Sequence, residues 1–513
     1  MIVADQKEIA AFLADPANWQ RGVQRVERIE THGSMVFLGG DLALKMKRAV
    51  KLDYMDFSTL ERRRRFCEAE LRLNRRTAPG LYRRVLPVTR GETGALALDG
   101  AGEPVEWLLE MARFDQDTLF DRLAGRGELT PPLVERLADA IAAFHAAAEP
   151  CPDGGGSAAM AAVIEANRQD FEGPYAAVLD QASVAAVIAG QQARLAATAA
   201  LQDRRRRQGA VRRCHGDLHL RNICLVEGRP TLFDCIEFND DFAVIDVLYD
   251  LAFLVMDLMH RRLPLLANLV LNRYLAHGGD LAGLALMPLF LSVRAAVRAK
   301  VSATMAATVT DPAAIAALRD EARQYLALAA TCLAVRPPRL VAIGGLSGSG
   351  KTTLARALAP GFGSAPGALV LRSDEIRKCL LGLPPTETLP EAAYSSDIGA
   401  KTYAEIAARA AAGLAAGQAV IADAVYARAA ERTAIEAVAR LAGVRFDGIW
   451  LEAPQPVLAG RIDARRDDAS DATASVLARQ VAYDLGEIAW RRLPAAAGPD
   501  AVAAAARAGL AAA

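Results

Sequence analysis

The sequence has little of several features that would point to a partner or a compartment. Its 60 basic and 60 acidic residues leave no net charge, so composition gives no electrostatic case for nucleic acid or a membrane surface. Its seven cysteines form no CxxC pair, which excludes the common zinc and redox motifs and favours free thiols in a reducing cytoplasm. No apolar run of about 18 residues lacks a charge, so no membrane-spanning helix is expected.

The first residues lack a basic segment followed by an apolar core, so no signal peptide is expected either. What the chain has is length and apolar content. With 513 residues, of which 52% are hydrophobic and 23% charged, it exceeds what one hydrophobic core usually serves. We therefore expect two or three folded domains in a cytoplasmic protein.

The first half of the chain is predicted to have a protein-kinase-like α+β fold. Short strands dominate up to about residue 110, interrupted by one strong helix within residues 57–78. Ser58 and Glu61 form a capping-box pattern at the start of that helix. Helices dominate from about residue 111 to 333, so a small strand-rich lobe is expected to precede a helical lobe.

The second half has a different rhythm. A Pro-containing stretch at residues 334–339 is typical of a linker. From Leu340 onward, short apolar strands alternate with Ala-rich helices, which predicts an α/β domain with a parallel sheet. We therefore expect two different domains in tandem, residues 1–333 and 340–513.

A glycine-rich stretch at the start of the second half matches the phosphate-binding loop pattern in full. It reads GLSGSGKT, follows an apolar strand and opens a helix, which is the context that G-x-x-x-x-G-K-[ST] requires. Backbone amides of such a loop surround phosphate oxygens, while Lys351 can reach the β- and γ-phosphates and the Thr352 hydroxyl can ligate Mg²⁺. The nucleotide-binding residues predicted here are Gly345, Ser347, Gly348, Ser349, Gly350, Lys351, Thr352 and Thr353.

Charged residues after the later strands extend this prediction to catalysis. Asp374 follows the second strand and is placed to take a proton from an acceptor hydroxyl, with Arg377 one turn later for an anionic group on the acceptor. Asp423 ends the third strand, a position suited to Mg²⁺. Arg461 and Arg465 share one helix face and can close over a transferring phosphate, although a solvated basic face is an equal alternative.

The stretch HGDLHLRN in the first half brings an acid and an amide close together. Asp217 can accept a proton from an attacking hydroxyl, and Asn222, five residues later, can ligate a metal ion, the spacing of H-R-D-x-x-x-x-N. Asp234, at the end of the next predicted strand, is the expected second Mg²⁺ ligand, with Glu237 as an accessory residue. His215 is expected to brace the loop through hydrogen bonds rather than to bind a metal.

A lysine on an early strand would complete a kinase site. The stretch DLALKMK is similar to the V-A-I-K strand, so Lys45 is predicted to bind phosphate, with Lys47 on the same strand face as the alternative. Glu70 or Glu68 on the following helix is the expected ion-pair partner. A pseudokinase remains the alternative interpretation, but a lysine, a base and two metal ligands in this order favour an active centre.

These motifs resemble two known families. With its HGDLHLRN loop, Asp234 and the D-L-A helix start at 250–252, the first half resembles the aminoglycoside phosphotransferase family over about residues 20–330. The second half resembles P-loop kinases such as polynucleotide 5′-kinase domains, chloramphenicol phosphotransferase, zeta toxins and gluconate kinase, over about residues 340–490. The tandem is similar to bacterial proteins predicted to be bifunctional aminoglycoside phosphotransferase-like and ATP-binding proteins.

The resemblance implies a bifunctional phosphotransferase that uses ATP, or GTP, with Mg²⁺ and a hydroxyl acceptor, and it implies that Asp246 and Asp250 brace the catalytic loop. Two alternatives stay open. One half alone could catalyse while the other binds nucleotide and regulates it. The P-loop half could instead phosphorylate polynucleotide 5′-hydroxyls, for which Tyr394, Tyr403 and Tyr426 give weak stacking support. No membrane partner is expected, and the sequence leaves the acceptors and the oligomeric state open.

Overall fold

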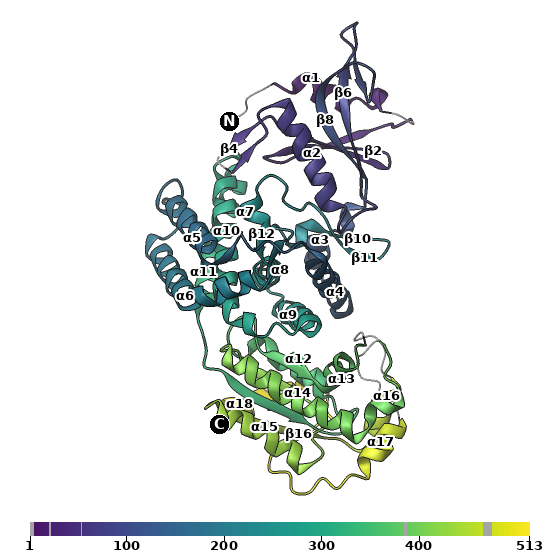
Figure 1. Ribbon diagram of the computed structural model, residues 1–513, viewed down its shortest axis with the longest axis vertical. Helices are drawn as coiled ribbons and strands as arrows, with labels where there is room; N and C mark the ends of the chain where they lie inside the picture. The colour runs from purple at the N-terminus through teal and green to yellow at the C-terminus, as the bar shows by residue number, and fades with distance from the viewer. Residues whose placement is uncertain (1–4, 20–21, 53, 384–386, 465–473, 513) are drawn as a thin grey trace. The chain divides into compact units, whose positions relative to one another are not determined.

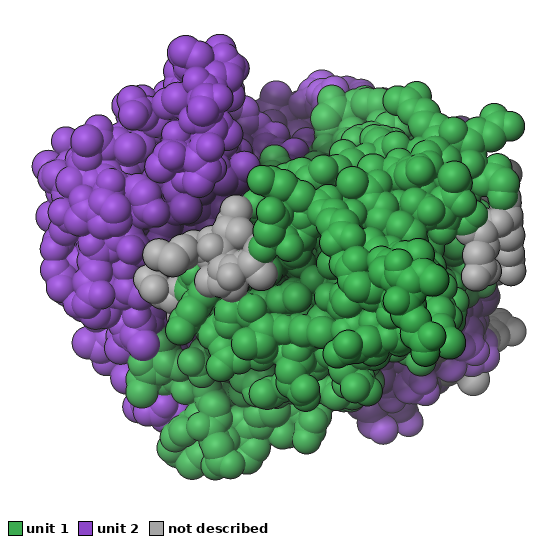
Figure 2. Space-filling view, turned by 90° about the horizontal axis from the view of Figure 1, so that it is seen from above, with its two compact units in different colours: residues 1–159, 205–250 green, residues 160–204, 251–513 purple. Residues whose placement is uncertain are grey.

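Contacts between residues divide the chain into two compact units (Figure 2). Unit 1 carries the strand-rich lobe and the HGD loop, whereas unit 2 carries most of the long helices and the P-loop domain. The helices after residue 250 therefore group with the second half of the chain, and the domain boundaries at 333 and 340 stay a prediction. Unit 1 spans residues 1–159 and 205–250, and unit 2 spans 160–204 and 251–513. The computed structural model describes residues 5–19, 22–52, 54–383, 387–464 and 474–512.

Unit 1 contains a six-stranded antiparallel sheet in the order β1-β2-β3-β8-β6-β7. Phe37 of β2 and Leu44 and Met46 of β3 are buried in its core, as the alternation of strand side chains requires. A Gly-Gly-Asp turn joins β2 to β3. The elements are α1 (Lys7–Ala14), η1 (Pro16–Asn18), β1 (Val26–Glu30), β2 (Ser34–Gly39), β3 (Leu42–Lys47), β4 (Lys51–Leu52), β5 (Met55–Asp56), β6 (Tyr82–Arg90), β7 (Leu96–Leu98) and β8 (Glu103–Ala112).

The strong helix predicted in this lobe is α2 (Leu60–Asn74), which packs against β8 and β6 (Figure 1). Its N-cap is Thr59, whose hydroxyl accepts a hydrogen bond from the backbone amide of Arg62 at 3.2 Å. The capping box predicted at Ser58 is therefore wrong by one residue. The amide of Ser58 bonds to the Asp56 carboxylate at 3.0 Å, so Ser58 belongs to the preceding turn.

The rest of unit 1 is a set of short elements around the HGD loop. The loop runs from β9, a strand paired with β12, into the antiparallel hairpin of β10 and β11. Helix α4 contacts β11 and so lies close to the loop. These elements are η2 (Gln116–Thr118), α3 (Phe120–Arg126), α4 (Pro131–Ala147), β9 (Val211–Arg213), η3 (Leu220–Asn222), β10 (Ile223–Val226), β11 (Arg229–Leu232), α7 (Asp240–Ala243) and β12 (Val244–Asp246).

Long helices form the first part of unit 2. The apolar side chains of α8 beyond residue 250, among them Leu251, Leu254 and Val255, are fully buried. Helices α10 and α11 pack against each other. The helices that lie wholly or mainly in this unit are α5 (Gly156–Glu172), α6 (Gln181–Arg207), α8 (Val247–His260), α9 (Pro264–Gly278), η4 (Ala282–Leu286), α10 (Met287–Ala306) and α11 (Pro312–Leu333).

Two helical stretches are long and apolar enough to cross a membrane by length and composition: Gln181–Arg207, and Ala282–Ala306, which joins η4 to α10. The sequence predicted no membrane-spanning helix because no long apolar run lacks a charge, and these two stretches do contain a few charged residues. The most apolar window of the second stretch is 78% buried, as in the core helix of a folded domain, whereas that of the first is 22% buried. Length and composition alone are weak evidence for a membrane span.

The P-loop domain contains the predicted parallel sheet, with strands in the order β14-β15-β13-β16-β17. Side chains of α12 and α18 form one core with Val341 and Ile343 of β13. The fifth strand, β17, was not predicted, because its sequence RRLP has no β-branched or aromatic residue. The elements are β13 (Arg339–Gly344), α12 (Lys351–Leu358), η5 (Ala359–Gly361), β14 (Leu369–Arg372), α13 (Ser373–Leu380), η6 (Glu391–Tyr394), α14 (Ser396–Ala415), β15 (Val420–Asp423), α15 (Ala429–Leu441), β16 (Arg445–Glu452), α16 (Gln455–Asp463), α17 (Ala474–Val481), β17 (Arg491–Pro494) and α18 (Pro499–Ala512).

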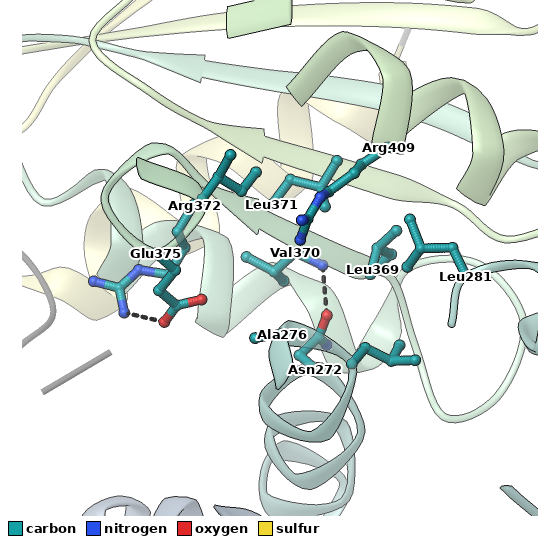
Figure 3. Close-up of a pocket in the computed structure, with 11 residues that line it drawn as sticks. Asn272, Ala276, Leu281, Leu369, Val370, Leu371, Arg372, Glu375 and Arg409 are labelled. Carbon is teal, nitrogen blue, oxygen red and sulfur yellow. Dashed lines mark hydrogen bonds and ion pairs between the residues drawn. The ribbon is translucent and has the colours of Figure 1, made fainter. Parts of the chain in front are cut away.

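Helix α9 covers the outer edge of strand β14 (Figure 3). The Asn272 side chain accepts a hydrogen bond from the amide of Val370 at 2.7 Å and donates one to the carbonyl of Ala368 at 3.1 Å. Asn268 donates a second bond to Ala368 at 3.0 Å. A small pocket beside this contact is lined by α9, β14 and α13, with Arg409 of α14. Both asparagines thus take the place of a neighbouring strand at a sheet edge.

Candidate active sites

Two lysines of β3 and one glutamate of α2 form the centre of the small lobe. Lys45 Nζ lies 2.7 Å from Glu70 Oε1 and 2.5 Å from Asp234 Oδ1. Lys47 Nζ lies 2.7 Å from the other oxygen of Glu70 and also pairs with Glu237. Both lysines therefore share Glu70, and Glu68 instead pairs with Arg64 at the surface.

Burial and charge compete in this cluster. Burial alone would lower the pKa of each lysine, but Asp234 and Glu70 raise the pKa of Lys45 well above its usual value, and Glu237 and Glu70 raise that of Lys47. Burial would raise the pKa of Glu70, yet the two ammonium groups lower it to about 2. The pKa of Glu237 is raised by burial, which Lys47 offsets only in part. Glu70 is thus ionised at neutral pH, and the ammonium of Lys45 is held between the carboxylates of Glu70 and Asp234.

The HGD loop orients the carboxylate of Asp217. Its Oδ2 accepts a hydrogen bond from Asn222 Nδ2 at 2.8 Å and lies 3.3 Å from His219 Nε2. The other ring nitrogen of His219 accepts the amide proton of Arg221 at 3.2 Å, so Nε2 carries a proton and donates. Because the nitrogen of the Asn222 amide faces Asp217, its oxygen points elsewhere and can serve a metal ion.

Asp250 of α8 holds the backbone of this loop in place. Its carboxylate accepts hydrogen bonds from the amides of His215 and Gly216 at 3.0 and 2.9 Å and lies 3.0 Å from His145 Nε2. The His215 ring in turn contacts the carbonyl of Phe233 at 2.9 Å. Gly216 has φ +85°, and a Cβ there would lie 2.8 Å from the Phe242 carbonyl oxygen, so only glycine fits.

Asp234 lies beside the loop, with a strained backbone at φ +63°. The amide of the preceding residue, Phe233, bonds to the carbonyl of Asn222 at 3.0 Å, which places Asp234 next to the predicted metal ligand Asn222. Its side chain is 42% exposed, so oxygen remains accessible beside Lys45. Carboxylate and amide oxygens with room for water and phosphate are the donor set that Mg²⁺ prefers, and these residues fit that ion.

Three residues that the sequence reasoning missed hold this centre. Asn74 Oδ1 accepts the amide proton of Cys235 at 2.8 Å, and the Tyr82 hydroxyl accepts that of Asp234 at 3.0 Å. His145, treated as structural, contacts Asp250. Asn74 could have been found, because it lies one helical turn after Glu70 on the same face of α2. Nothing in the sequence links Tyr82 or His145 to the loop.

In the second half, the P-loop leads from β13 into α12 as predicted. Gly345, Gly348 and Gly350 all have positive φ, and a Cβ at Gly348 would lie 2.4 Å from the carbonyl oxygen of Leu458. Lys351 Nζ donates to the carbonyl of Leu346 at 3.1 Å, so the lysine lies over its own loop. Ser347, Ser349, Thr352 and Thr353 occupy the rest of the loop and the first turn of α12, and Gln480 of α17 accepts the Ser347 amide proton at 2.8 Å.

Residues from three strand ends meet at the carboxyl edge of this sheet. Thr352 Oγ1 donates to Asp423 Oδ2 at 2.5 Å, and Arg372 Nε lies 3.9 Å from the same oxygen. Arg372 also pairs with Glu375 at 2.8 Å (Figure 3). Burial raises the pKa of Asp423, although Lys351, Arg372 and the Thr352 hydroxyl act against it. A hydroxyl and a carboxylate side by side suit Mg²⁺ bound to a nucleotide.

The predicted base and arginines lie around this edge. Asp374 opens α13 and is 3.4 Å from Arg377, whose guanidinium lies 5.0 Å from the centre of the Tyr394 ring. Arg461 of α16 approaches the P-loop, because a Cβ at Gly350 would lie 4.0 Å from its Nη1. Arg465 lies outside the described residues.

The aromatic residues offered in support of nucleic-acid binding are not open stacking platforms. Tyr426 is fully buried and packs edge-on against Trp490 with ring centres 5.2 Å apart. The Tyr403 hydroxyl accepts the amide proton of Tyr426 at 3.0 Å, and burial raises the pKa of Tyr403. Tyr394 is covered on one face by Arg377. Tyr426 is therefore a core ring, whereas Tyr403 and Tyr394 are half-buried.

Comparisons with known proteins agree with the two-part architecture. Residues 59–287 match the model of a phosphotransferase enzyme family, and residues 340–483 match that of an AAA domain. Uncharacterized proteins of Mycobacterium tuberculosis and Mycobacterium bovis are each 30% identical to the chain over 475 residues, covering 89% of this chain and 90% of theirs. The chain belongs to this family of tandem phosphotransferase-like and P-loop proteins.

Solved structures resemble one half of this tandem protein at a time. The aminoglycoside phosphotransferase APH(4)-Ia is 15% identical and covers 63% of this chain and 99% of its own, with a TM-score of 0.37. A gluconokinase from Sinorhizobium meliloti is 25% identical and covers 34% of this chain and 93% of its own, with a TM-score of 0.26. The two family matches show that the tandem protein is an ATP-dependent kinase, which confirms the prediction from its sequence.

Proposed function

We propose that both halves are catalytic, each transferring the γ-phosphate of ATP to a hydroxyl acceptor. The observation that carries this proposal is the convergence, in each half, of an acid, a lysine and oxygen donors that lie far apart in the sequence. Lys45, Asp217 and Asp234 converge in the first half. Lys351, Thr352 and Asp423 converge in the second, near the strand edge that leads to Asp374.

In the first half, Asp217 is the proposed base. Its carboxylate is held by Asn222 and His219, so it can accept the proton of an acceptor hydroxyl with little rearrangement. Lys45, fixed between Glu70 and Asp234, would hold the ATP phosphates. Asn222 and Asp234 would hold Mg²⁺, which when bound neutralises phosphate charge.

In the second half, the P-loop amides, Lys351 and Arg461 would surround the phosphates, and Thr352 and Asp423 would hold Mg²⁺. Asp374 is the proposed base. Arg377, 3.4 Å from Asp374, would hold an anionic group of the acceptor. The alternative of a polynucleotide 5′-hydroxyl kinase draws little support from Tyr403 and Tyr426, because Tyr426 is fully buried and the hydroxyl of Tyr403 is bonded to the backbone amide of Tyr426.

Phosphoryl transfer from γ-labelled ATP with two single variants tests the proposal. Asp217→Asn should abolish one set of labelled products and Lys351→Ala the other, because each removes an essential group of one site only. Asp241→Asn and Lys401→Ala alter exposed residues of the same types and should change neither set. Loss of all products in only one variant would support a single catalytic half with a regulatory partner, and unchanged products in both would overturn the proposal.

The remaining parts of the proposal are the domain boundaries at residues 333 and 340 and a cytoplasmic location. The location is supported by the seven cysteines, which form no disulfide in the described structure. Five of the seven thiols are buried in the described structure, and cysteines without disulfides suit a reducing compartment.

A further inference from the structure

Four aromatic side chains from three separate segments of unit 1 pack together, and we call them the aromatic wall. They are His32 of the β1–β2 turn, Tyr54 of the β4–β5 hairpin, and Phe238 and Phe242, which follow β11. Ring centres lie 6.3 Å apart for His32 and Tyr54, 6.2 Å for Tyr54 and Phe238, 6.4 Å for Tyr54 and Phe242, and 6.3 Å for Phe238 and Phe242. The wall is therefore one continuous surface.

Part of this surface faces solvent. Tyr54 is 40% exposed and Phe242 is 37% exposed, although rings of this size are usually covered in folded domains. Among the described residues of unit 1, the remaining exposed large apolar side chain is Ile29, at 36%. Ile29 stands alone on β1, which needs no explanation, whereas two adjacent exposed rings point to a bound partner.

The wall borders the centre that holds Asp217. A Cβ added to Gly216 would lie 2.8 Å from the carbonyl oxygen of Phe242. The backbone of Phe242 therefore packs against Gly216, the residue before Asp217. Phe238 follows Glu237, the partner of Lys47, directly in the chain. Burial lowers the pKa of His32, and the charges of Asp217 and Asp234 oppose that change.

The geometry of the rings indicates the chemistry of the partner. Centre distances of 6.2–6.4 Å are those of rings in direct contact. The rings therefore leave no space between them for a cation, as an aromatic cage would. The ring planes are inclined to one another by 42–86°, so the wall offers both faces and edges of aromatic rings, with the polar atoms of Tyr54 and His32 beside them. A flat, largely apolar ring can stack on one exposed ring and meet its neighbour edge to face, and it can hydrogen-bond to those polar atoms.

We propose that the aromatic wall binds the acceptor of the first half, an alcohol carried on or next to a planar ring. The ring packs against Tyr54 and Phe242, and the hydroxyl reaches Asp217. The hydroxyl oxygen bonds to the γ-phosphorus, the bond from that phosphorus to the β–γ bridging oxygen breaks, ADP leaves, and the hydroxyl proton passes to Asp217. The inference rests on the proposed function of this half and specifies its substrate class.

The test uses the full chain with Lys351→Ala, so that transfer comes from the first half alone. Thymidine and pyridoxine serve as planar-ring alcohols, and glycerol and choline as alcohols without a planar ring, each with γ-labelled ATP. The expected result is Asp217-dependent labelling of at least one ring alcohol, with kcat/KM at least tenfold above that of glycerol and choline. Labelling of neither ring alcohol, or preference for glycerol or choline, would overturn the inference.

Variants of the wall separate binding from general damage. Tyr54→Ala and Phe242→Ala should each raise KM for the ring alcohol about 5- to 140-fold, the effect of losing one stacking ring. Tyr54→Phe keeps the ring and should raise KM less than Tyr54→Ala does, and Ile29→Ala is the matched control with similar exposure outside the wall. Unchanged KM in Tyr54→Ala would refute the role of the wall. Labelling that persists in Asp217→Asn would instead refute the proposed function of this half.

Discussion

Replacing Glu70 by glutamine should destabilise the small lobe by an amount that can be worked from the structure. Glu70 is fully buried and holds the ammonium groups of Lys45 and Lys47, each at 2.7 Å. Burial would raise its pKa, but the two lysines lower the pKa of Glu70 from 4.5 to about 2. At about 1.4 kcal/mol per pKa unit, this difference corresponds to about 3 kcal/mol of stability at neutral pH.

The sign of the effect sets the pH range of the experiment. Because the pKa of Glu70 is lower in the folded chain, its contribution is present above pH 4.5 and is lost as the pH falls toward about 2. Glu237 has the opposite effect, because its pKa is raised in the folded chain. The stability that its protonated carboxyl contributes is lost as the pH rises above 4.5. Glu70→Gln should therefore lower the free energy of unfolding by about 3 kcal/mol at pH 7 and by almost nothing near pH 2.

Pulse proteolysis in urea, with mass spectrometry of peptides from β3 and α2, measures the unfolding of this lobe separately from the rest of the chain. Thermolysin serves near neutral pH and pepsin at acid pH. Glu68→Gln is the matched control, because Glu68 lies on the same helix in an exposed pair with Arg64, and it should change the free energy by less than about 1 kcal/mol. If the pH profile of Glu70→Gln runs parallel to that of the parent chain from pH 5 to pH 2, the reasoning is refuted.

Two further predictions concern the P-loop domain. Because burial raises the pKa of Asp423 and Mg²⁺ needs its carboxylate ionised, Mg²⁺-dependent ATP binding should weaken as the pH falls, and it should do so at a higher pH than an ordinary aspartate would require. Asp423→Asn should flatten this dependence in calorimetric titrations. Asn272→Ala removes the side chain that bonds to Val370 and Ala368 and should lower the free energy of unfolding by about 1–3 kcal/mol, measured by urea unfolding; a loss below about 0.5 kcal/mol would contradict the edge contact.

The parts of the sites that could be predicted were those encoded by short spacing. The P-loop and the HGD loop each place several polar groups within eight residues, and the local backbone alone brings them together. Lys45 and Glu70 were predictable because a strand and a helix of known type precede the loop. Lys47 was left as an alternative to Lys45, and in the folded chain it joins the same cluster through Glu70 and also pairs with Glu237.

The contacts that could not be predicted join segments whose residues have no unusual pattern. His145 lies in an Ala-rich helix and Tyr82 in an ordinary strand, and their roles depend on which element the fold places opposite them. The aromatic wall is of the same kind, because His32 and Tyr54 belong to turns and carry no periodic signal. Strand β17 was missed for a local reason, since its arginines and proline disfavour a strand and only pairing with β16 makes it one.

The asparagines of α9 bear on why the two halves are joined. An edge strand of a parallel sheet presents unpaired amide and carbonyl groups that need a partner. A carboxamide side chain offers one acceptor and two donors, the same groups as a peptide, and Asn272 uses both kinds on Val370 and Ala368. Helix α9 lies within residues 59–287, the part matched by the phosphotransferase family model, whereas β14 lies within the AAA match at 340–483. The first half therefore supplies the hydrogen-bonding partner of β14, the strand that leads into Asp374. The two family matches thus meet within one packed region of the chain. The edge strand of the P-loop sheet has this partner only when both halves belong to one chain.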